Sequence, residues 1–538
     1  MNIFNQQPSL KPGDKCLWGG LPSSGRALAV VESALKYSGL TLIITDTAQQ
    51  ASTQSRALEF FAAQQNLSIF TFPDWEILPY DIFSPHQDII SARLQTLAKL
   101  PNANHGVLIV PLTTLMHRIA PIDFVASRTF CYSIGEQLDR GLLQDQLSRA
   151  GYKRVDTVYE HGEFAFRGSI IDVFPMGVKT PFRMDLLDDD IESLRLFDPE
   201  SQRTLENVEQ IELLPAREFP MDKESINLFL NNWHERFDHN PTKCPVYRDI
   251  KDGIAPQGIE YYLSLFFEQT ATLFDYLPTN LQLFTSSGIE QAAEQFWSDI
   301  NNRYQEYGVD PERPLLKPEE IFLPVDRLFH EIKKRPRTIL DSQPIDPAAH
   351  LQDSGIVPVP DMSVNAKQTS PLQKLHDFLI AFEADKAGSR VLFCAESSGR
   401  REVLTDLLKT IQVHPTEVDS WLQFVDSDLQ YGIITYPLEQ GIACPNNGLC
   451  LITEGELFGQ QVMQRRRRSK ASESPDYIFK SLAELKIGAP VVHIEHGVGR
   501  YQGLVTLDVD KTAQEFLMLS YANDAKLYVP VSSLHLIS

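Results

Sequence analysis

Leu40-Thr-Leu-Ile-Ile-Thr45 is a short apolar run between Gly39 and Asp46, which is the pattern of a parallel strand buried on both faces. Helical and strand patterns alternate around this run: Ala27–Leu35, Ser52–Gln65, Leu67–Phe72 and Gly106–Leu112. Such an alternation predicts an open parallel sheet with crossover helices. We therefore expect an α/β domain in the N-terminal part of the chain.

Changes in pattern along the chain predict a multidomain α/β protein. We expect a first α/β domain in two parts (1–126 and 214–348), a β-rich insert (127–213), a second α/β domain (349–460), a linker (461–486) and a small C-terminal β-barrel (487–538). Residues 341–371 are rich in Pro, Asp, Ser and Gln, which is typical of a connecting segment.

The composition is that of a globular protein. Of the 538 residues, 43% are hydrophobic and 22% are charged, which excludes a disordered or collagen-like chain. No apolar run reaches the about 20 residues of a membrane span, and the N-terminus shows no secretory signal, so we expect a soluble, cytoplasmic protein. The formal charge is −22, and an evenly acidic surface repels nucleic acid. Contact with DNA would therefore need a local basic patch or a partner protein.

A nucleotide-binding loop is nearly present at Gly20-Leu-Pro-Ser-Ser-Gly25-Arg26-Ala27. Both glycines of the GxxxxGK[ST] pattern stand at the right spacing ahead of a helical stretch. Arg26 replaces the lysine that reaches the β- and γ-phosphates, and Ala27 replaces the hydroxyl that ligates Mg²⁺. Arginine is not a conservative replacement and alanine offers no metal ligand, so we favour a loop that no longer supports ATP hydrolysis over an ATPase site.

The segment from Phe182 to Phe197 predicts a β-hairpin with an aspartate-rich turn. Alternate residues from Phe182 face the core, which leaves Arg183 and Leu187 on the opposite face. An apolar residue beside a fixed arginine is a typical protein-binding pair. A salt-bridged structural arginine explains the pattern equally well, and the sequence leaves both interpretations open.

The remaining motifs indicate no metal or cofactor site. His493 and His496 would lie on opposite faces of a strand, without an obvious third ligand. The six cysteines are scattered without a CxxC pair, so we expect buried, reduced thiols. Arg465–Arg468 is the one strong basic run; we interpret it as a solvated linker, with a non-specific phosphate contact as the alternative.

Several blocks of the sequence resemble the bacterial transcription-repair coupling factors, and together they extend along essentially the whole chain. They are Phe72–Asp81 (FPDWEILPYD), Ser84–His86, Asp88–Leu94, Glu160–Pro175 (EHGEFAFRGSIIDVFP), Gly258–Leu263, Thr453–Gly459, Val491–Tyr501 and Tyr521–Pro530.

The resemblance implies a domain organisation. In this family a module similar to the repair protein UvrB is a helicase-like α/β domain interrupted by a β-rich insert that binds UvrA. A second α/β domain follows, and then a small SH3/Tudor-like barrel that binds the β subunit of RNA polymerase. Full-length members continue into a DNA translocase motor that uses ATP and Mg²⁺ and makes most of the DNA contacts. The present sequence ends at Ser538, where the barrel would end, so we expect it to lack this motor and to hold no cofactor.

UvrB also carries a tyrosine-rich hairpin that clamps damaged DNA. Between Phe72 and Ala98 there is no room for such a hairpin, and Tyr80 is the only tyrosine there. By resemblance, the module is expected neither to hydrolyse ATP nor to clamp lesions.

The resemblance also implies docking residues on the insert. Arg167 and Arg183 match the two arginines that contact UvrA in the family. Leu187 stands where some relatives have an aromatic residue, and it keeps the apolar bulk but loses stacking. Arg183 and Leu187 are the same outward pair that strand alternation indicates.

For RNA polymerase, the resemblance implies that Gly503–Asp508 adds a strand to the sheet of the β subunit. Leu507 is the expected anchor, with Leu504 and Thr506 on the same strand. If the barrel core covers Leu507 instead, a register shift of one residue exchanges it with Thr506.

The leading hypothesis is a non-catalytic adaptor between stalled RNA polymerase and UvrA in transcription-coupled nucleotide excision repair. One alternative is an ATP-using, helicase-like module that acts directly on DNA. Another is a structural or autoinhibitory module that binds no partner in isolation.

Overall fold

The computed structural model describes residues 4, 8, 11–238, 240–341, 355–364, 371–458, 490–493, 497–509, 512–521 and 526–530. The chain forms two compact units, Met1–Gln461 and Val462–Ser538. Among the described residues, no helix combines the length and the hydropathy that a membrane span requires.

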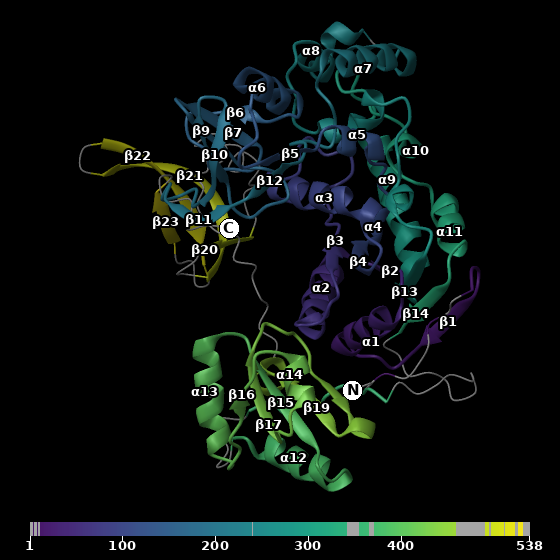
Figure 1. The fold of residues 1–538 in the computed structure, drawn as a ribbon, viewed down its shortest axis with the longest axis vertical. Coiled ribbons are helices and arrows are strands. Elements are labelled where there is room, and N and C mark those ends of the chain that lie inside the picture. The colour runs from purple at the N-terminus through teal and green to yellow at the C-terminus, as the bar shows by residue number, and fades with distance from the viewer. Residues whose placement is uncertain are drawn as a thin grey trace. The chain divides into compact units, whose positions relative to one another are not determined.

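The first unit is built on a six-stranded sheet in which every pairing is parallel (Figure 1). The strand order is β1-β14-β13-β2-β4-β3. Its members are β1 (Lys15–Trp18), β2 (Leu40–Thr45), β3 (Ile69–Thr71), β4 (Gly106–Pro111), β13 (Leu281–Ser286) and β14 (Arg337–Leu340). The strands predicted around the apolar run of β2 are confirmed.

Both faces of this sheet are buried. Leu42 and Ile44 of β2 belong to a core on one face, together with residues of α3 (Gln87–Lys99). Ile43 belongs to a core on the other face, which α1 (Ser23–Lys36) and α2 (Ala48–Ala62) cover. The two predicted helices are therefore present, although each begins four residues earlier than its pattern suggested.

The β-rich insert is a second six-stranded sheet, of order β11-β10-β9-β8-β7-β6. Its strands are β6 (Lys153–Arg154), β7 (Glu163–Arg167), β8 (Ile170–Val173), β9 (Phe182–Leu187), β10 (Asp190–Phe197) and β11 (Thr204–Val208). Helix α6 (Arg140–Arg149) precedes the sheet in the chain. Strands β5 (Phe130–Ser133) and β12 (Gln210–Leu213) pair antiparallel, so the two ends of the insert meet.

Seven further helices and four 3₁₀ turns complete the described part of the first α/β domain. They are α4 (Leu112–Leu115), α5 (Ile122–Ser127), α7 (Lys223–Arg236), α8 (Pro245–Lys251), α9 (Ile289–Tyr307), α10 (Pro318–Ile321) and α11 (Val325–Lys333), with the 3₁₀ turns η1 (Leu100–Asn102), η2 (Pro241–Lys243), η3 (Ile259–Phe266) and η4 (Leu273–Tyr276). The block Gly258–Leu263 overlaps the 3₁₀ segment η3, in which Tyr262 leaves helical dihedral angles.

The second α/β domain has a five-stranded sheet of order β16-β17-β15-β19-β18. Its elements are α12 (Gln373–Asp385), β15 (Arg390–Ala395), α13 (Ser398–Lys409), β16 (Thr416–Glu417), α14 (Trp421–Asp426), β17 (Tyr431–Thr435), β18 (Ile442–Cys444), η5 (Pro445–Asn447), β19 (Leu449–Thr453) and α15 (Glu454–Phe458). Only β18 runs antiparallel to its neighbour, so β15, β16, β17 and β19 form a parallel sheet with one antiparallel edge strand.

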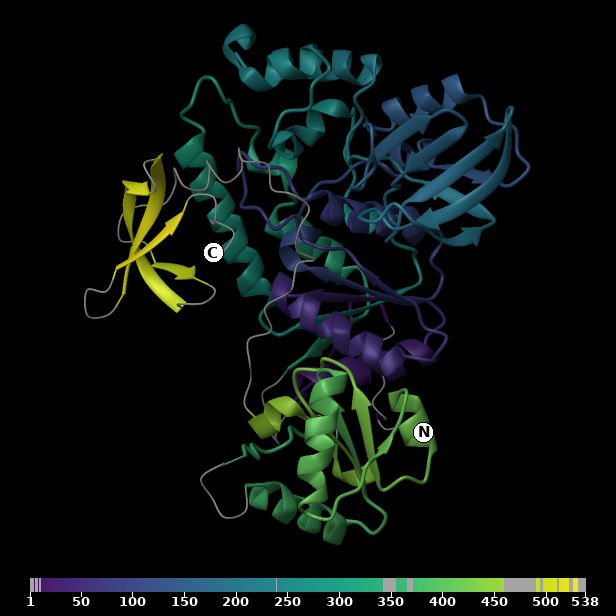
Figure 2. The same ribbon diagram turned by 90° about the vertical axis from the view of Figure 1, so that its left-hand side faces the viewer.

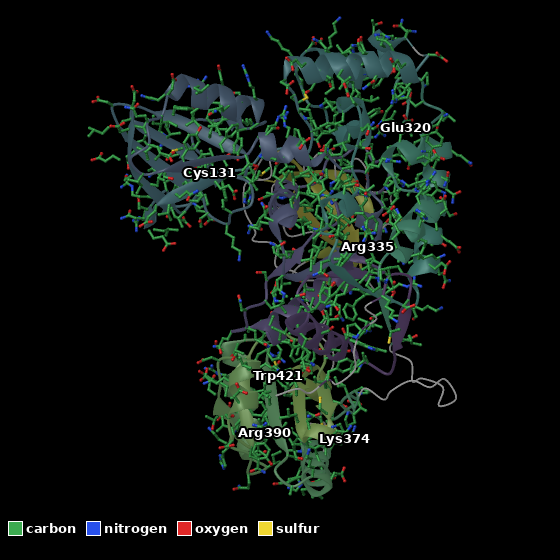
Figure 3. All side chains as sticks on the ribbon, turned by 45° about the vertical axis from the view of Figure 1, so that its right-hand side comes forward. Cys131, Glu320, Arg335, Lys374, Arg390 and Trp421 are labelled. Carbon is green, nitrogen blue, oxygen red and sulfur yellow. The ribbon has the colours of Figure 1, made fainter. Side chains whose placement is uncertain are left out.

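The two α/β domains share one hydrophobic core. Both ribbon views place α2 beside the second domain (Figures 1 and 2). Phe60 and Phe61 of α2 lie against Trp421 of α14, with ring centroids 6.3 and 5.3 Å away. Trp421 lies at the end of the second domain that faces the first (Figure 3). The domains are therefore joined by apolar burial.

Two expectations need correction here. Part of the segment expected to be a plain linker is structured, since Ile356 and Met362 are buried and Val357 forms a β-bridge with Ala443. All six cysteines are free thiols as expected, but Cys131 is exposed because it lies on the short strand β5 at the base of the insert (Figure 3).

The second unit contains four antiparallel strands in the order β20-β21-β22-β23. They are β20 (Pro490–His493), β21 (Gly497–Val509), β22 (Thr512–Ser520) and β23 (Lys526–Pro530). The strand predicted at 503–508 is confirmed as part of β21. Closure of this sheet into an SH3/Tudor-like barrel stays a prediction.

Candidate docking surfaces

The outer face of the insert carries the residues expected to bind UvrA. In β9, Phe182, Met184 and Leu186 are buried, whereas Arg183 and Leu187 point to the opposite face. This alternation is the one predicted from the sequence. Pairing with β8 sets Asp172 directly opposite Arg183 on this outer face.

Arg183 is fixed by a buried carboxylate. Its Nε and Nη2 donate to Oδ1 and Oδ2 of Asp172 at 2.7 and 2.9 Å, which is the bidentate geometry of a strong charge-assisted pair. Nη1 donates to the backbone oxygen of Gln202 at 3.3 Å, and the guanidinium lies 4.6 Å from the ring centroid of Phe197. Hydrogen bonding to Asp172 raises the pKa of Arg183. With its side chain 16% exposed, Arg183 is a salt-bridged arginine whose edge remains accessible.

Arg167 and Leu187 are the more accessible members of the predicted set. The Arg167 side chain is 46% exposed, and its Nη2 donates to Oδ2 of Asp172 at 3.2 Å. Leu187 is 63% exposed at the hairpin end of β9. At about 3.3 Å per residue, Leu187 lies roughly 13 Å along the strand from Arg183. The face therefore combines two arginines at one end with an apolar side chain at the other.

Asp185 lies between these two ends. Arg195 of β10 forms an ion pair with Asp185, and the Ser193 hydroxyl donates to it at 2.8 Å. Asp190 lies directly opposite Leu187 and is exposed on the same face, so three aspartates balance the three arginines of this face. What the face can still offer a partner is the accessible guanidinium edges of Arg167 and Arg183, which suit carboxylates, and the apolar side chain of Leu187.

Sequence reasoning did not assign a role to Asp172, Gln202 or Arg195. Asp172 lies within one of the blocks that carry the family resemblance, but only the β8–β9 register shows that it faces Arg183. Gln202 arrives from a loop after β10, where a positive φ of 58° at this residue shapes the turn. No local pattern indicates such a contact.

The degenerate nucleotide loop precedes a helix, as predicted, but the helix begins inside the motif, and the strand β1 before the loop was not predicted. Gly20 has a φ of 68°, which glycine adopts without strain, and α1 starts at Ser23. The amide of Arg26 donates to the backbone oxygen of Pro22 at 2.9 Å. A phosphate-binding loop uses such amides to cradle its ligand, whereas this one is bound within the helix.

Residues of the second α/β domain cover this loop. A methyl group at Gly25 would lie 2.9 Å from Cγ2 of Ile356, so this side chain rests directly on the glycine. The hydroxyl of Ser24 donates to the backbone oxygen of Gln440 at 2.6 Å. Ala27 is fully buried. The four motif residues Gly20, Gly25, Arg26 and Ala27 thus lie at a joint between domains.

Arg26 is held in a partly buried position. Burial lowers the pKa of Arg26, and the nearby carboxylates of Asp46 and Asp341 oppose that shift. Its buried Nε has no hydrogen-bond partner in the described part of the chain. Arg26 therefore interacts electrostatically with Asp46 and Asp341 at the end of the sheet. In an active nucleotide-binding loop, a lysine at this position would contact the phosphates of the nucleotide.

Strand β21 offers an edge in the second unit. It pairs with β22 from Arg500 to Val509, whereas β20 pairs only with Gly497–Arg500. On the β20 side, residues 503–508 have no strand partner among the described strands. The side chains of Leu504, Thr506 and Leu507 lie outside the described part of the chain, so only their backbone register opposite Leu517, Glu515 and Gln514 is known.

Three domain families match the chain. Residues 132–219 match the UvrB interaction domain, residues 384–457 match the MFD, D3 domain, and residues 485–538 match the CarD-like/TRCF RID domain. The first match contains the β8–β9–β10 surface, and the third contains β21.

Curated relatives align with nearly the entire chain. The transcription-repair-coupling factor of Escherichia coli K12 is 44% identical over 98% of this chain and 45% of its own length. Those of Haemophilus influenzae and Bacillus subtilis are 39% and 27% identical over 100% and 96% of the chain, and 46% and 44% of their own lengths. The chain thus spans slightly less than half the length of the relatives it matches. Along that span it is similar throughout to transcription-repair-coupling factors, which confirms the family resemblance found in the sequence.

Proposed function

We propose that this chain is a cytoplasmic, non-catalytic adaptor of transcription-coupled nucleotide excision repair. Its insert docks UvrA through Arg167, Arg183 and Leu187. Its C-terminal unit, closed as a small SH3/Tudor-like barrel, adds strand β21 to the sheet of the RNA polymerase β subunit. The similarity to transcription-repair-coupling factors and the matches to the UvrB interaction domain and the CarD-like/TRCF RID domain support both halves of the proposal.

The observation that carries the proposal is the arrangement of Arg183 and Arg167 on Asp172, with Leu187 exposed at the end of the same strand. Arginine side chains that a salt bridge already holds in the free protein lose little conformational entropy when a partner binds. Arg183 can therefore be both a salt-bridged structural residue and a binding residue, because the ion pair with Asp172 holds the guanidinium that the partner would contact. The accessible guanidinium edges of Arg167 and Arg183 favour carboxylates on the partner.

An ATP-using module is the weaker alternative. Arg26 and Ala27 lack the chemistry of a nucleotide loop, and Ile356 and Gln440 occupy its mouth. We propose accordingly that residues of this chain bind no ATP, Mg²⁺ or other cofactor, and that DNA contacts are made mainly elsewhere in full-length relatives.

Purified UvrA and RNA polymerase, each titrated onto the immobilised chain, test the proposal. We expect Arg167→Glu and Leu187→Asp each to weaken UvrA binding at least tenfold, which corresponds to about 1.4 kcal/mol, with polymerase binding unchanged. Val403→Asp is the matched control, because Val403 is 60% exposed on α13 of the second α/β domain. Arg183→Glu is less informative, since it would place a second carboxylate against Asp172, which is 1% exposed.

Each other outcome is diagnostic. Unchanged UvrA binding by both folded variants would remove the assignment of this face. Failure of the wild-type chain to bind either partner would favour the autoinhibitory module. Saturable ATP binding that is lost in Arg26→Ala, together with salt-dependent DNA binding, would favour the helicase-like alternative.

A further inference from the structure

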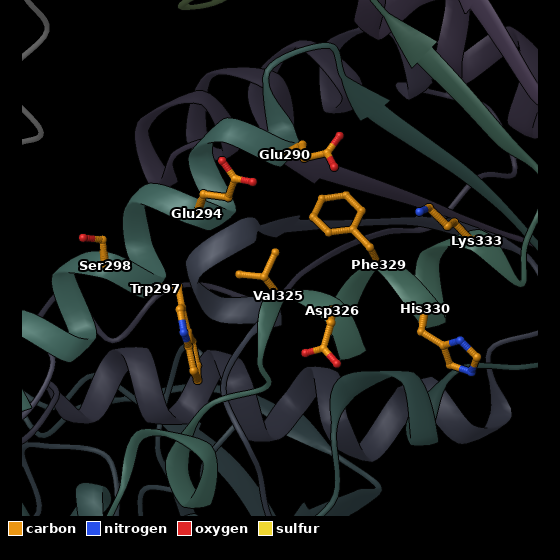
Figure 4. A pocket seen from close by; sticks show the side chains of 9 residues that line it. All are labelled: Glu290, Glu294, Trp297, Ser298, Val325, Asp326, Phe329, His330 and Lys333. Carbon is orange, nitrogen blue, oxygen red and sulfur yellow. The ribbon is translucent and has the colours of Figure 1, made fainter.

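A groove of about 700 Å³ lies between α9 and α11, outside the insert and the nucleotide loop (Figure 4). Its floor consists of Trp297 from α9 and of Val325 and Phe329 from α11. In Figure 4, Val325 lies between the two aromatic rings. Phe329 is buried, whereas Trp297 and Val325 are half-buried. The groove therefore has an apolar, partly aromatic floor.

The position of Trp297 in its helix makes this exposure informative. Ala293 and Ile300, four residues before and three after Trp297, are buried, so Trp297 belongs to the core-facing stripe of α9. A tryptophan on such a stripe is normally covered by the element packed against it. Here part of the ring faces the groove instead, which leaves apolar surface available to a ligand.

The rim of the groove is acidic. Glu290 and Glu294 on α9 and Asp326 on α11 are exposed around the floor, and none of them has a hydrogen bond or ion pair within the described part of the chain. Glu290 and Asp326 stand in the first turns of their helices, where the helix dipole alone would favour a carboxylate. That explanation does not extend to Glu294, nor to the aromatic floor beneath it.

We propose that this groove binds a helical segment of a partner protein that presents an arginine or lysine beside apolar side chains. The apolar side chains would rest on Val325 and Phe329, as in helix-in-groove recognition. The cationic group would lie over the face of Trp297 and pair with Glu294. Lys333 at one end of the rim reduces the negative charge by one but leaves a net excess of carboxylates.

The same features exclude a nucleic acid as the occupant. Three unpaired carboxylates repel phosphate, and a backbone contact needs basic residues. A small free cation would neutralise the rim carboxylates but would leave the apolar side chains of the floor exposed to water. The proposal concerns a third surface of the chain and stands or falls independently of UvrA and polymerase binding.

The chain contains its own reporter for this groove. Of its five tryptophans, Trp18, Trp75, Trp233 and Trp421 are buried, so ligand-dependent fluorescence changes arise at Trp297. The first probe is a designed helical peptide with leucines at positions i and i+4 and arginines beside them, compared with a twin that carries glutamate in place of arginine. We expect the arginine peptide to change the fluorescence saturably and the glutamate peptide to have no effect.

Variants then assign the signal to the groove. Glu294→Lys is expected to weaken binding of the arginine peptide at least tenfold, and Glu294→Gln is expected to weaken this binding less. Glu306→Lys is the matched control, because it makes the same charge change on the same exposed helix but outside the groove. Equal binding by wild type and Glu294→Lys would overturn the proposal. So would spermidine, if it reproduced the full signal and displaced the peptide, since that result would define a small-cation site.

A photo-crosslinking amino acid at Ser298, on the rim, identifies the natural occupant in cells that produce the full chain. We expect one predominant crosslinked protein segment, with arginine or lysine within four residues of an apolar residue. The crosslink should be lost in the Glu294→Lys variant and retained in the Glu306→Lys variant. Crosslinks to nucleic acid, to acidic segments, or to many proteins without this pattern would contradict the proposal.

Discussion

Asp172 shows how one residue organises a surface. It is almost fully buried on the outer face of the insert and accepts hydrogen bonds from both Arg183 and Arg167. A buried carboxylate is costly unless it is paired, so these two contacts stabilise the fold as well as position the arginines. Leu187 has no such partner and is free to contribute apolar contact area. The face therefore divides into a fixed, charged end and an apolar end.

Glu260 is a second residue whose surroundings have a measurable consequence. It is buried in η3, where the Ser84 hydroxyl donates to its Oε2 at 2.7 Å. Burial raises the pKa of Glu260 to about 7, with a further contribution from Glu218, while Arg217 opposes the shift. The folded protein thus binds this proton more tightly than the unfolded chain does.

The contribution of Glu260 to the free energy of unfolding is therefore expected to fall as the pH rises from about 4.5 to about 7, the interval between its ordinary and its folded pKa. Burial lowers the pKa of His117 to about 3, so His117 contributes in the opposite direction below about pH 6.5, and the effect of Glu260 is measured as the difference between wild type and Glu260→Gln. Glu260→Gln should remove this contribution, so that the variant gains stability relative to wild type as the pH rises through this interval, by up to about 3 kcal/mol above pH 7. Chemical denaturation between pH 4 and 8 measures both effects. Exposed Glu268→Gln is the control, and an unchanged slope in Glu260→Gln would refute the assignment.

At the scale of elements, helix α1 shows how a motif can keep its spacing and lose its geometry. Its first turn includes half of the nucleotide-loop pattern, and Gly25 lies in that turn against Ile356. Glycine usually weakens a helix by about 1 kcal/mol relative to alanine. Here the close approach of Ile356 supplies a reason for glycine that has nothing to do with phosphate.

Gly25→Ala is therefore expected to destabilise the chain by about 1–3 kcal/mol, although helix propensity alone predicts the opposite sign. In an Ile356→Ala background the same change should cost less, because the contact has been removed. A double-mutant cycle by denaturant unfolding measures this coupling. Strict additivity of the two changes would show that Ile356 does not rest on Gly25. Pro22, whose Cδ lies 3.0 Å from the added methyl group, accounts for any remaining cost.

At the scale of the whole molecule, the first unit is held together by a core that two α/β domains build jointly. Phe60 and Phe61 meet Trp421, and the Tyr436 hydroxyl donates to the backbone oxygen of Arg56 at 2.9 Å. An apolar joint of this kind makes the domains unfold together, since separating them exposes large aromatic surfaces. It also keeps the second domain over the nucleotide loop.

Trp421→Ala should lower the stability of the first unit by about 3–5 kcal/mol and split its thermal unfolding into two transitions. Differential scanning calorimetry of the full chain detects the split. Trp297→Ala removes a tryptophan from the α9–α11 groove and should leave the transition undivided. A single, shifted transition in Trp421→Ala would mean that other contacts are sufficient to couple the domains.

Much of this architecture follows from local patterns. The run of β2, the β9–β10 hairpin and the outward positions of Arg183 and Leu187 were all predictable, because strand periodicity depends only on neighbouring residues. That Arg26 and Ala27 leave a loop without nucleotide chemistry stays a prediction. Helix starts were less predictable, since α1 depends on the close approach of distant residues.

Tertiary structure decided which residues meet. Asp172 and Arg183 are 11 residues apart and belong to different strands, whereas Ser24 and Gln440 are separated by 416 residues. The groove of Trp297 likewise needs the packing of α11 against α9. A residue's type and spacing determine the face it occupies, but its partner depends on strand register and domain packing, which arise from burial of the entire core rather than from any local sequence.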